Sequence, residues 1–112
     1  MKNKVIVVLC TCPDRETARR LAFDLVEGGL AACVNLVPGL TSIYRWEGRT
    51  EESEECLMIA KTSTAGFERL RDRVVDLHPY ELPEIVAVPV TDGLPEYLDW
   101  VTESTAGETR EA

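Results

Sequence analysis

The chain has 112 residues, of which 20 are acidic and 12 are basic, so its formal net charge is −8. This length predicts one domain that can fold without disulfide bonds. An acidic surface disfavours nucleic acid as a partner, and no apolar run approaches the roughly 20 residues of a membrane span. Because no signal-peptide pattern is present either, we expect a cytoplasmic protein with reduced cysteines, namely Cys10, Cys12, Cys33 and Cys56.

The first quarter of the chain predicts a strand followed by a helix. The β-branched run at residues 4–11 is typical of a strand that is buried on both faces. Pro13 then lies in the first turn of a helix that Thr11 or Asp14 caps. The apolar residues of this helix recur at helical spacing: Ala18, Leu21, Ala22, Leu25 and Val26.

Gly28-Gly29 ends that helix, and an unusually long strand follows it. The 15 residues from 32 to 46 span roughly 50 Å when extended, whereas a compact chain of this length has a diameter of roughly 34 Å. Even with a kink at Pro38-Gly39, the far half of the strand should project beyond its own core. Tyr44 and Trp46 share one face near its tip, so we expect them to contact another subunit.

The middle of the chain predicts a hairpin and a second helix. Glu47-Gly48-Arg49 has the composition of a hairpin turn, and residues 54–62 return as an antiparallel strand. Ser63 or Thr64 is expected to cap the helix, and His78-Pro79 ends it. The residues that share its predicted buried face are Phe67, Leu70, Val74 and Leu77.

Residues 85–90 predict a fourth strand, in which Pro89 indicates an edge position or a bulge. Asp92-Gly93 then turns the chain into a short third helix, whose apolar residues are Leu94, Tyr97, Leu98 and Val101. The element order β-α-β-β-α-β-α predicts an α+β, ferredoxin-like split βαβ sandwich, with two helices on one face of an antiparallel sheet. We expect a single domain over residues 1–104 and a flexible tail over residues 105–112.

Several segments resemble the CutA divalent-ion-tolerance family in order and spacing. The resemblance rests on Ala31-Ala32-Cys33-Val34-Asn35, residues 38–48, Lys61-Thr62, residues 78–84 and Tyr97-Leu98-x-Trp100. It covers most of the chain, from about Val5 to Val101. It implies a ferredoxin-like fold of PII-like architecture, a tight homotrimer formed through the long hairpins, and an association with tolerance to copper and other divalent ions.

The resemblance also implies a candidate metal site. Some family members bind copper through a cysteine at the position of Cys10 and through two consecutive histidines just before Pro-Tyr. This chain keeps Cys10 and His78 but has Leu77 in place of the other histidine, which predicts weak binding of Cu(II). The alternatives are that Cys10 is a small buried apolar residue and that His78 is favoured by the helix dipole at a helix end.

Two further segments have candidate ligand-binding residues. Pro79 and Pro83 make a rigid loop around Tyr80 and Glu81, which predicts a ligand cleft next to a neighbouring subunit; the alternative is a stiff connector. The acidic run at residues 51–55 has the charge of a cation site but lacks an EF-hand pattern. We interpret it as a solvated, charged hairpin arm.

Enzyme signatures are absent from the sequence, since it contains no Gly-rich phosphate loop, HExxH or GxSxG. A nucleophilic pair of Cys10 with His78 is formally available but has no local support. We therefore expect a non-enzymatic homotrimer that has no obligatory cofactor and binds Cu(II) or another divalent cation weakly. The alternative is a PII-like signalling or scaffold protein that binds a small ligand or a protein partner in clefts between subunits.

Overall fold

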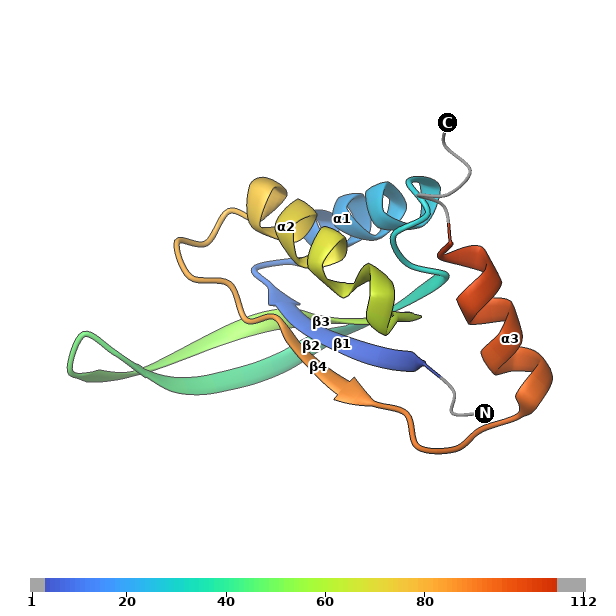
Figure 1. Ribbon diagram of the computed structural model, residues 1–112. Helices are drawn as coiled ribbons and strands as arrows, with labels where there is room; N and C mark the ends of the chain where they lie inside the picture. The colour runs from blue at the N-terminus through green and yellow to red at the C-terminus, as the bar shows by residue number, and fades with distance from the viewer. Residues whose placement is uncertain (1–3, 107–112) are drawn as a thin grey trace.

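The computed structural model describes residues 4–106 and has the element order that the sequence predicts (Figure 1). A short 3-10 turn at Thr64–Gly66 precedes the second helix. The helices and strands are β1 (Val5–Cys12), α1 (Arg15–Glu27), β2 (Cys33–Trp46), β3 (Arg49–Ser63), α2 (Phe67–Leu77), β4 (Val86–Pro89) and α3 (Pro95–Ser104).

The four strands form one antiparallel sheet in the order β2-β3-β1-β4. Helices α1 and α2 lie side by side on one face of this sheet, and α3 flanks it at one end (Figure 1). This arrangement confirms the predicted α+β, split βαβ fold. Strand β4 pairs with β1 at the edge of the sheet, where Pro89 costs no interior ladder hydrogen bond.

The hydrophobic core lies between the sheet and the two helices. Alternate residues of β1 point toward the helices, and the same holds for β3. The buried residues of this layer are Ile6, Val8, Cys10 and Cys12 of β1, Cys56, Met58 and Ala60 of β3, Ala18, Leu21 and Leu25 of α1, and Leu70 and Val74 of α2. Three buried cysteines therefore belong to the core.

The ends of the first two helices show which local predictions were right. The Asp14 side chain accepts a hydrogen bond from the Thr17 N–H at 2.8 Å, so Asp14 caps α1. The predicted cap of α2 at Ser63 or Thr64 is wrong, because Ser63 precedes the 3-10 turn, Thr64 begins that turn, and Gly66 occupies the N-cap position of the helix. The predicted buried faces each run one residue too far, and the last members, Val26 and Leu77, are exposed.

The hairpin of β2 and β3 projects well beyond the two helices (Figure 1). Its turn consists of Glu47 and Gly48, both with positive φ, and the flanking residues Trp46 and Arg49 pair directly. A two-residue turn of this kind matches the twist of paired strands. Strand β3 begins at Arg49, not at residue 54 as predicted, because the ladder continues to the turn. The molecule is 45 Å along its longest axis.

A β-bulge bends β2 at the predicted kink. Val37 pairs with Leu57 and Leu40 pairs with Glu55, so β2 has one residue more than β3 between these pairs. Gly39 has φ of 81°, a value that glycine adopts without strain. The extra residue exchanges the faces of the sheet to which the odd-numbered and even-numbered side chains of β2 point. Its even-numbered residues beyond the bulge therefore lie on the same face as Glu55.

The sheet face opposite α1 and α2, here called the open face, is apolar. Its central residues are Val7 and Leu9 of β1, Leu57 and Ile59 of β3, and Val86 and Val88 of β4. The two valines of β4 are about half exposed. An apolar face on which no helix lies is typical of a surface that meets a partner.

Helix α3 ends at the predicted domain boundary, Ser104, but the packed structure includes the next residue. Thr105, which we assigned to the tail, is buried, and its hydroxyl donates to the Val101 carbonyl at 2.8 Å. Ala106 is half-buried, and residues 107–112 of the predicted tail lie outside the described residues.

Truncating the fully buried Leu25 to alanine should destabilise the fold by about 2–5 kcal/mol, because the helix-to-sheet core loses a side chain and gains a cavity. The control is Val75→Ala on the exposed side of α2, which should change stability by less than about 0.5 kcal/mol. Denaturant unfolding at one fixed chain concentration measures both. Equal losses would mean that the layer between α1 and the sheet does not carry the stability.

Candidate functional site

Two candidate sites meet at the loop that connects α2 to β4. This loop, residues 78–84 and here called the 78–84 loop, leaves the helical layer and passes the end of the sheet from which the hairpin projects (Figure 1). It contains His78, the predicted metal ligand, and Tyr80 and Glu81, the predicted residues of the ligand cleft. One site lies on its helix side and the other on its hairpin side.

Both ring nitrogens of His78 are engaged in hydrogen bonds. Nε2 lies 2.9 Å from the Thr11 carbonyl oxygen, and Nδ1 accepts the Tyr80 backbone N–H at 3.1 Å. Because a carbonyl oxygen only accepts, Nε2 must carry the proton and the ring is in its neutral Nε2–H form. His78 is buried, and its ring packs on that of Tyr80 with centroids 4.7 Å apart. The histidine therefore anchors the loop to β1.

A cluster of two thiols and an imidazole, here called the thiol cluster, lies beneath this loop. One ligand atom from each of Cys10, Cys12 and His78 lies within 4.8 Å of the others, and all three residues are buried. The structure thus brings the two predicted ligands, Cys10 and His78, together. It adds Cys12, which we had not assigned. The spacing Cys-x-Cys could have identified it, since residues i and i+2 of a strand share a face.

The two thiols of the cluster differ in acidity. The hydrogen bond between the two sulfurs, assisted by burial, raises the pKa of Cys10 well above its ordinary value. The same hydrogen bond lowers the pKa of Cys12, against the effect of burial. Cys12 is therefore the more acidic thiol of the pair, whereas the Cys10 thiol also lies 3.8 Å from the Thr11 carbonyl oxygen, to which it donates. The cluster supplies one thiolate readily and the second only at a cost.

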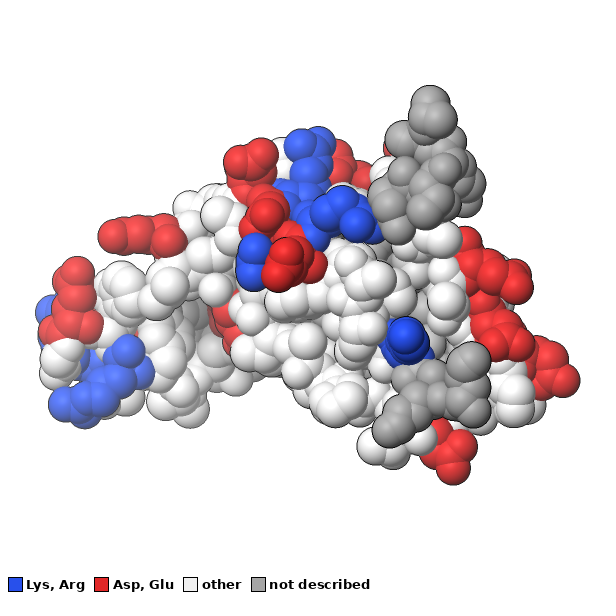
Figure 2. Space-filling view, in the orientation of Figure 1, with Lys and Arg blue, Asp and Glu red and all other residues white. Residues whose placement is uncertain are grey.

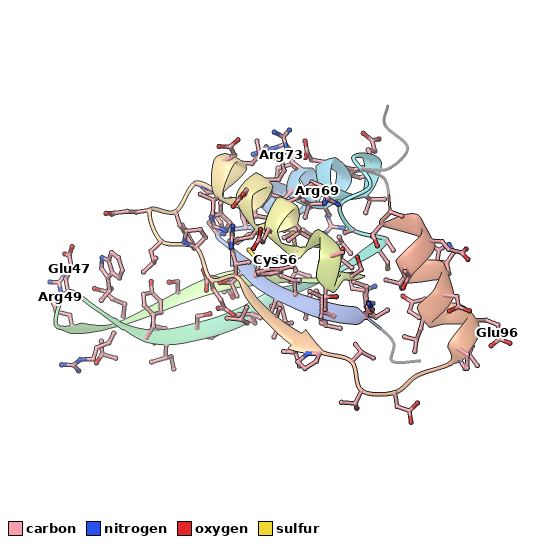
Figure 3. All side chains as sticks on the ribbon, viewed as in Figure 1. Glu47, Arg49, Cys56, Arg69, Arg73 and Glu96 are labelled. Carbon is pink, nitrogen blue, oxygen red and sulfur yellow. The ribbon has the colours of Figure 1, made fainter. Side chains whose placement is uncertain are left out.

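A third buried thiol lies beside this pair. Cys56 on β3 is the direct cross-strand partner of Cys12, and Figure 3 shows it near the centre of the molecule beneath the helices. Burial raises the pKa of Cys56, and the charge of Cys12 raises it further. Cys10, Cys12 and Cys56 are all free thiols, as is the half-buried Cys33 on β2.

On the hairpin side of the loop, Tyr80 binds a buried carboxylate. Its hydroxyl donates to Glu55 Oε2 at 2.6 Å, and Glu55 is only 8 % exposed. Burial raises the pKa of the Tyr80 phenol, and the hydrogen bond to Glu55 raises it further, so the phenol keeps its proton. The interpretation of residues 51–55 as a wholly solvated arm is therefore wrong at Glu55. The sequence of acidic residues alone does not show which of them the 78–84 loop covers in the fold.

A cleft of about 530 Å³ opens between the hairpin and the 78–84 loop. Ser42, Tyr44 and Trp46 line it from β2, on the face that the bulge turns toward Glu55. The predicted cleft residues Tyr80 and Glu81 line it from the loop. The remaining residues around it are Ile43, Glu55, Leu82 and Glu84. Sequence reasoning missed Glu55 and Glu84, which become neighbours only through the fold.

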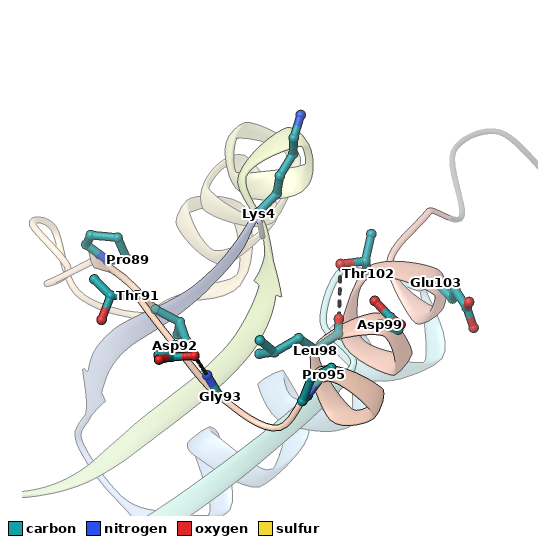
Figure 4. A pocket seen from close by; sticks show the side chains of 11 residues that line it. Lys4, Pro89, Thr91, Asp92, Gly93, Pro95, Leu98, Asp99, Thr102 and Glu103 are labelled. Atoms are coloured by element: carbon teal, nitrogen blue, oxygen red, sulfur yellow. Dashed lines mark hydrogen bonds between the residues drawn. The ribbon is translucent and has the colours of Figure 1, made fainter. Parts of the chain in front are cut away.

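A second and larger hollow, about 1050 Å³, lies between the end of β4 and α3 (Figure 4). Its wall includes Lys4, Asp92, Leu98, Asp99 and Glu103. None of the residues that the sequence singled out for binding lies in this wall. The Asp92 side chain accepts the Gly93 N–H and so serves its own turn. The cleft beside the 78–84 loop is therefore the better candidate.

Charged side chains are unevenly spread over the surface. Figure 2 shows acidic groups along α3, both signs over the helical layer and the hairpin tip, and a largely uncharged surface between them. Arg73 of α2 and Asp24 of α1 form an ion pair with two hydrogen bonds of 2.8 and 2.9 Å. This pair joins the two helices, and Figure 3 shows Arg73 on the outer side of the helical layer.

Comparisons with known proteins place these features in one family. A family model described as "CutA1 divalent ion tolerance protein" matches residues 6–104. The divalent-cation tolerance protein CutA of Thermus thermophilus is 58 % identical over 99 residues, which are 88 % of this chain and 96 % of that protein. The chain therefore belongs to the CutA1 divalent-ion tolerance family.

Solved structures of the family have the same fold. CutA1 from Oryza sativa superposes with a TM-score of 0.90 at 40 % identity, covering 99 % of this chain and 98 % of that one. A CutA from Archaeoglobus fulgidus, described as a periplasmic divalent cation tolerance protein, has a TM-score of 0.87 at 42 % identity, covering 90 % of this chain and 98 % of that one. In residues 4–106, no helix is long and apolar enough to cross a membrane.

Tyr80→Phe removes the phenol hydroxyl and should destabilise the protein by about 1–3 kcal/mol, because the buried Glu55 carboxylate then loses a hydrogen-bond donor. Tyr44→Phe is the matched control, because the Tyr44 hydroxyl pairs with Ser53 at 2.9 Å in an exposed position. It should cost less than about 1 kcal/mol. Thermal unfolding of the two variants gives the comparison, and an equal effect would show that the Tyr80–Glu55 bond does not hold the loop.

Proposed function

We propose that this chain acts in divalent-ion tolerance by weak, reversible binding of copper, or of another soft divalent ion, at the thiol cluster. The observation that supports this proposal is the convergence of Cys10, Cys12 and His78 within 4.8 Å. Thiolate and imidazole are ligands that select copper and zinc over Mg(II) and Ca(II). Family members are named for divalent-cation tolerance, which agrees with this chemistry.

The geometry explains why such binding would be weak. Around one shared ion, ligand atoms lie about 4 Å apart, so the cluster has to contract slightly. His78 has its one lone pair on Nδ1, which already accepts the Tyr80 N–H. Only Cys12 loses its proton readily, since the pKa of Cys10 is raised. Contracting the cluster, giving up the hydrogen bond from Tyr80 and deprotonating Cys10 each cost free energy. The affinity for the metal is therefore lower than that of thiolates and an imidazole without these constraints.

The protein is proposed to work as a non-enzymatic homotrimer in the cytoplasm. The apolar open face and the projecting hairpin support assembly, because both have apolar side chains that residues 4–106 leave exposed. Tyr44 and Trp46, at the rim of the cleft, would then lie at or near the boundary between subunits. The free thiols support a reducing compartment.

The cleft between the hairpin and the 78–84 loop supports a second candidate function. Its volume of about 530 Å³ is in the range of small-molecule sites, and it combines apolar walls with a few polar groups. The chain would then be a PII-like sensor or scaffold that binds a small ligand beside a subunit boundary. The two functions use opposite sides of one loop.

Copper titration tests the metal proposal. Cys12→Ser should weaken binding at least about tenfold, equivalent to about 1.4 kcal/mol, because it removes the readily formed thiolate. Cys10→Ser and His78→Ala should also weaken it. Cys33→Ser is the matched control and should leave it unchanged, since Cys33 lies on β2 outside the cluster. The sulfur-to-copper absorption, measured without oxygen, reports occupancy directly.

Binding should also weaken as pH falls, because copper competes with protons for the Cys12 sulfur. The lowered pKa of Cys12 moves this loss to lower pH than an ordinary thiol would show. Equal affinities in the wild type, Cys10→Ser and Cys12→Ser would remove the thiol cluster from the metal site. That result would leave the second candidate function in its place.

A charge on the open face tests assembly. Light scattering on the wild type should give about three chain masses, because the resemblance to the CutA family implies a homotrimer, which is a closed cyclic assembly. Val88→Glu should reduce this mass, because it would bury an unpaired carboxylate between subunits. Val75→Glu is the control, since Val75 is similarly exposed but lies on α2. A wild-type monomer at micromolar concentration would contradict the proposal.

A further inference from the structure

The cleft between the hairpin and the 78–84 loop has an unusual combination of walls. Three aromatic rings line it, those of Tyr44, Trp46 and Tyr80, and three carboxylates join them, those of Glu55, Glu81 and Glu84. No lysine or arginine is among the described residues that surround it. We propose that this cleft binds a small organic cation, a molecule with an ammonium group on a short apolar body.

This inference rests on the second candidate function, binding of a small ligand, and does not depend on the thiol cluster. It adds the chemical class of the ligand. The cluster is buried beneath the helices, whereas the cleft opens on the hairpin side of the loop. The two proposals can therefore fail separately.

The carboxylate at the floor of the cleft supplies the charge. Glu55 is 8 % exposed, and the Tyr80 hydroxyl donates to its Oε2 at 2.6 Å. The phenol keeps its proton, because burial and this hydrogen bond raise its pKa. A neutral donor satisfies one oxygen of the carboxylate and leaves the negative charge uncompensated. A buried carboxylate in this state favours a cation strongly.

The second carboxylate approaches from the loop. Glu84 Oε1 lies 3.5 Å from the Thr11 hydroxyl, which holds the side chain against the end of β1. Glu81 is exposed at the rim. Charge complementarity therefore selects a positively charged group and disfavours nucleotides, phosphates and organic acids.

The aromatic rings decide between an organic cation and a metal ion. The bulge at Val37 and Leu40 turns Tyr44 and Trp46 onto the face of Glu55, so rings and carboxylate border one space. Trp is the best aromatic partner for an ammonium group, and the interaction strengthens where water is excluded. Mg(II) and Ca(II) prefer sites in which oxygen atoms surround the ion, whereas rings and aliphatic side chains such as Ile43 and Leu82 form much of this wall.

Trp46 provides the readout for a direct test. The chain has two tryptophans, so Trp100→Phe leaves Trp46 as the only one. Butylammonium is the probe, and butyrate, of similar size and opposite charge, is the matched control. Both are titrated at constant ionic strength with a chelator present, so that no metal contributes. We expect saturable quenching by butylammonium in the millimolar range and none by butyrate.

Two carboxylate variants locate the site. Glu55→Gln keeps an acceptor for the Tyr80 hydroxyl but removes the charge, and it should weaken butylammonium binding at least about fivefold. Glu84→Gln, at an exposed position, should weaken it less and keeps the test valid if Glu55→Gln does not fold. Glu96→Gln on α3 is the control, far from the cleft (Figure 3), and should have no effect.

Three outcomes would overturn the proposal. The first is equal quenching by butylammonium and butyrate. The second is unchanged affinity in both Glu55→Gln and Glu84→Gln. The third is absence of butylammonium binding in the assembled protein, which would mean that a basic side chain of a second copy occupies the cleft. Binding that persists in Cys12→Ser would show that the cleft functions even where the metal proposal fails.

Discussion

The hydrogen bonds of a single histidine ring determine the arrangement of both candidate sites. Nε2 of His78 donates to the Thr11 carbonyl, and Nδ1 accepts the Tyr80 N–H, so the ring joins the end of β1 to the start of the 78–84 loop. The ring lies beside the thiols of Cys10 and Cys12 on one side. On the other side it positions Tyr80 to reach Glu55. A change at His78 itself is therefore expected to affect both sites.

The fold makes this arrangement possible because α1 and α2 cover only one face of the sheet. That layer contains the core and the thiol cluster, whereas the open face and the projecting hairpin expose apolar residues. In the proposed trimer a partner would cover these surfaces and bring a subunit boundary near the cleft. The thiol cluster needs no partner, since one chain supplies Cys10, Cys12 and His78.

Sequence reasoning predicted the fold because periodicity and turn residues are local signals. It predicted the kink at Pro38-Gly39, but not that the bulge turns Tyr44 and Trp46 onto the face of Glu55, because register depends on pairing between strands. It paired Cys10 with His78 through the resemblance and omitted Cys12. Glu55 and Glu84 were missed because they line one cleft only after the hairpin and the 78–84 loop, which are distant in sequence, come together in the fold.

The protonation state of His78 tests the central claim most directly, and it can be read without mutation because the chain has a single histidine. Long-range proton–nitrogen NMR of the folded protein at neutral pH should show one neutral imidazole with its proton on Nε2 and an unprotonated, hydrogen-bonded Nδ1. A ring protonated on Nδ1, or one that averages freely between both forms, would contradict the account, because neither could hold Thr11 and Tyr80 together.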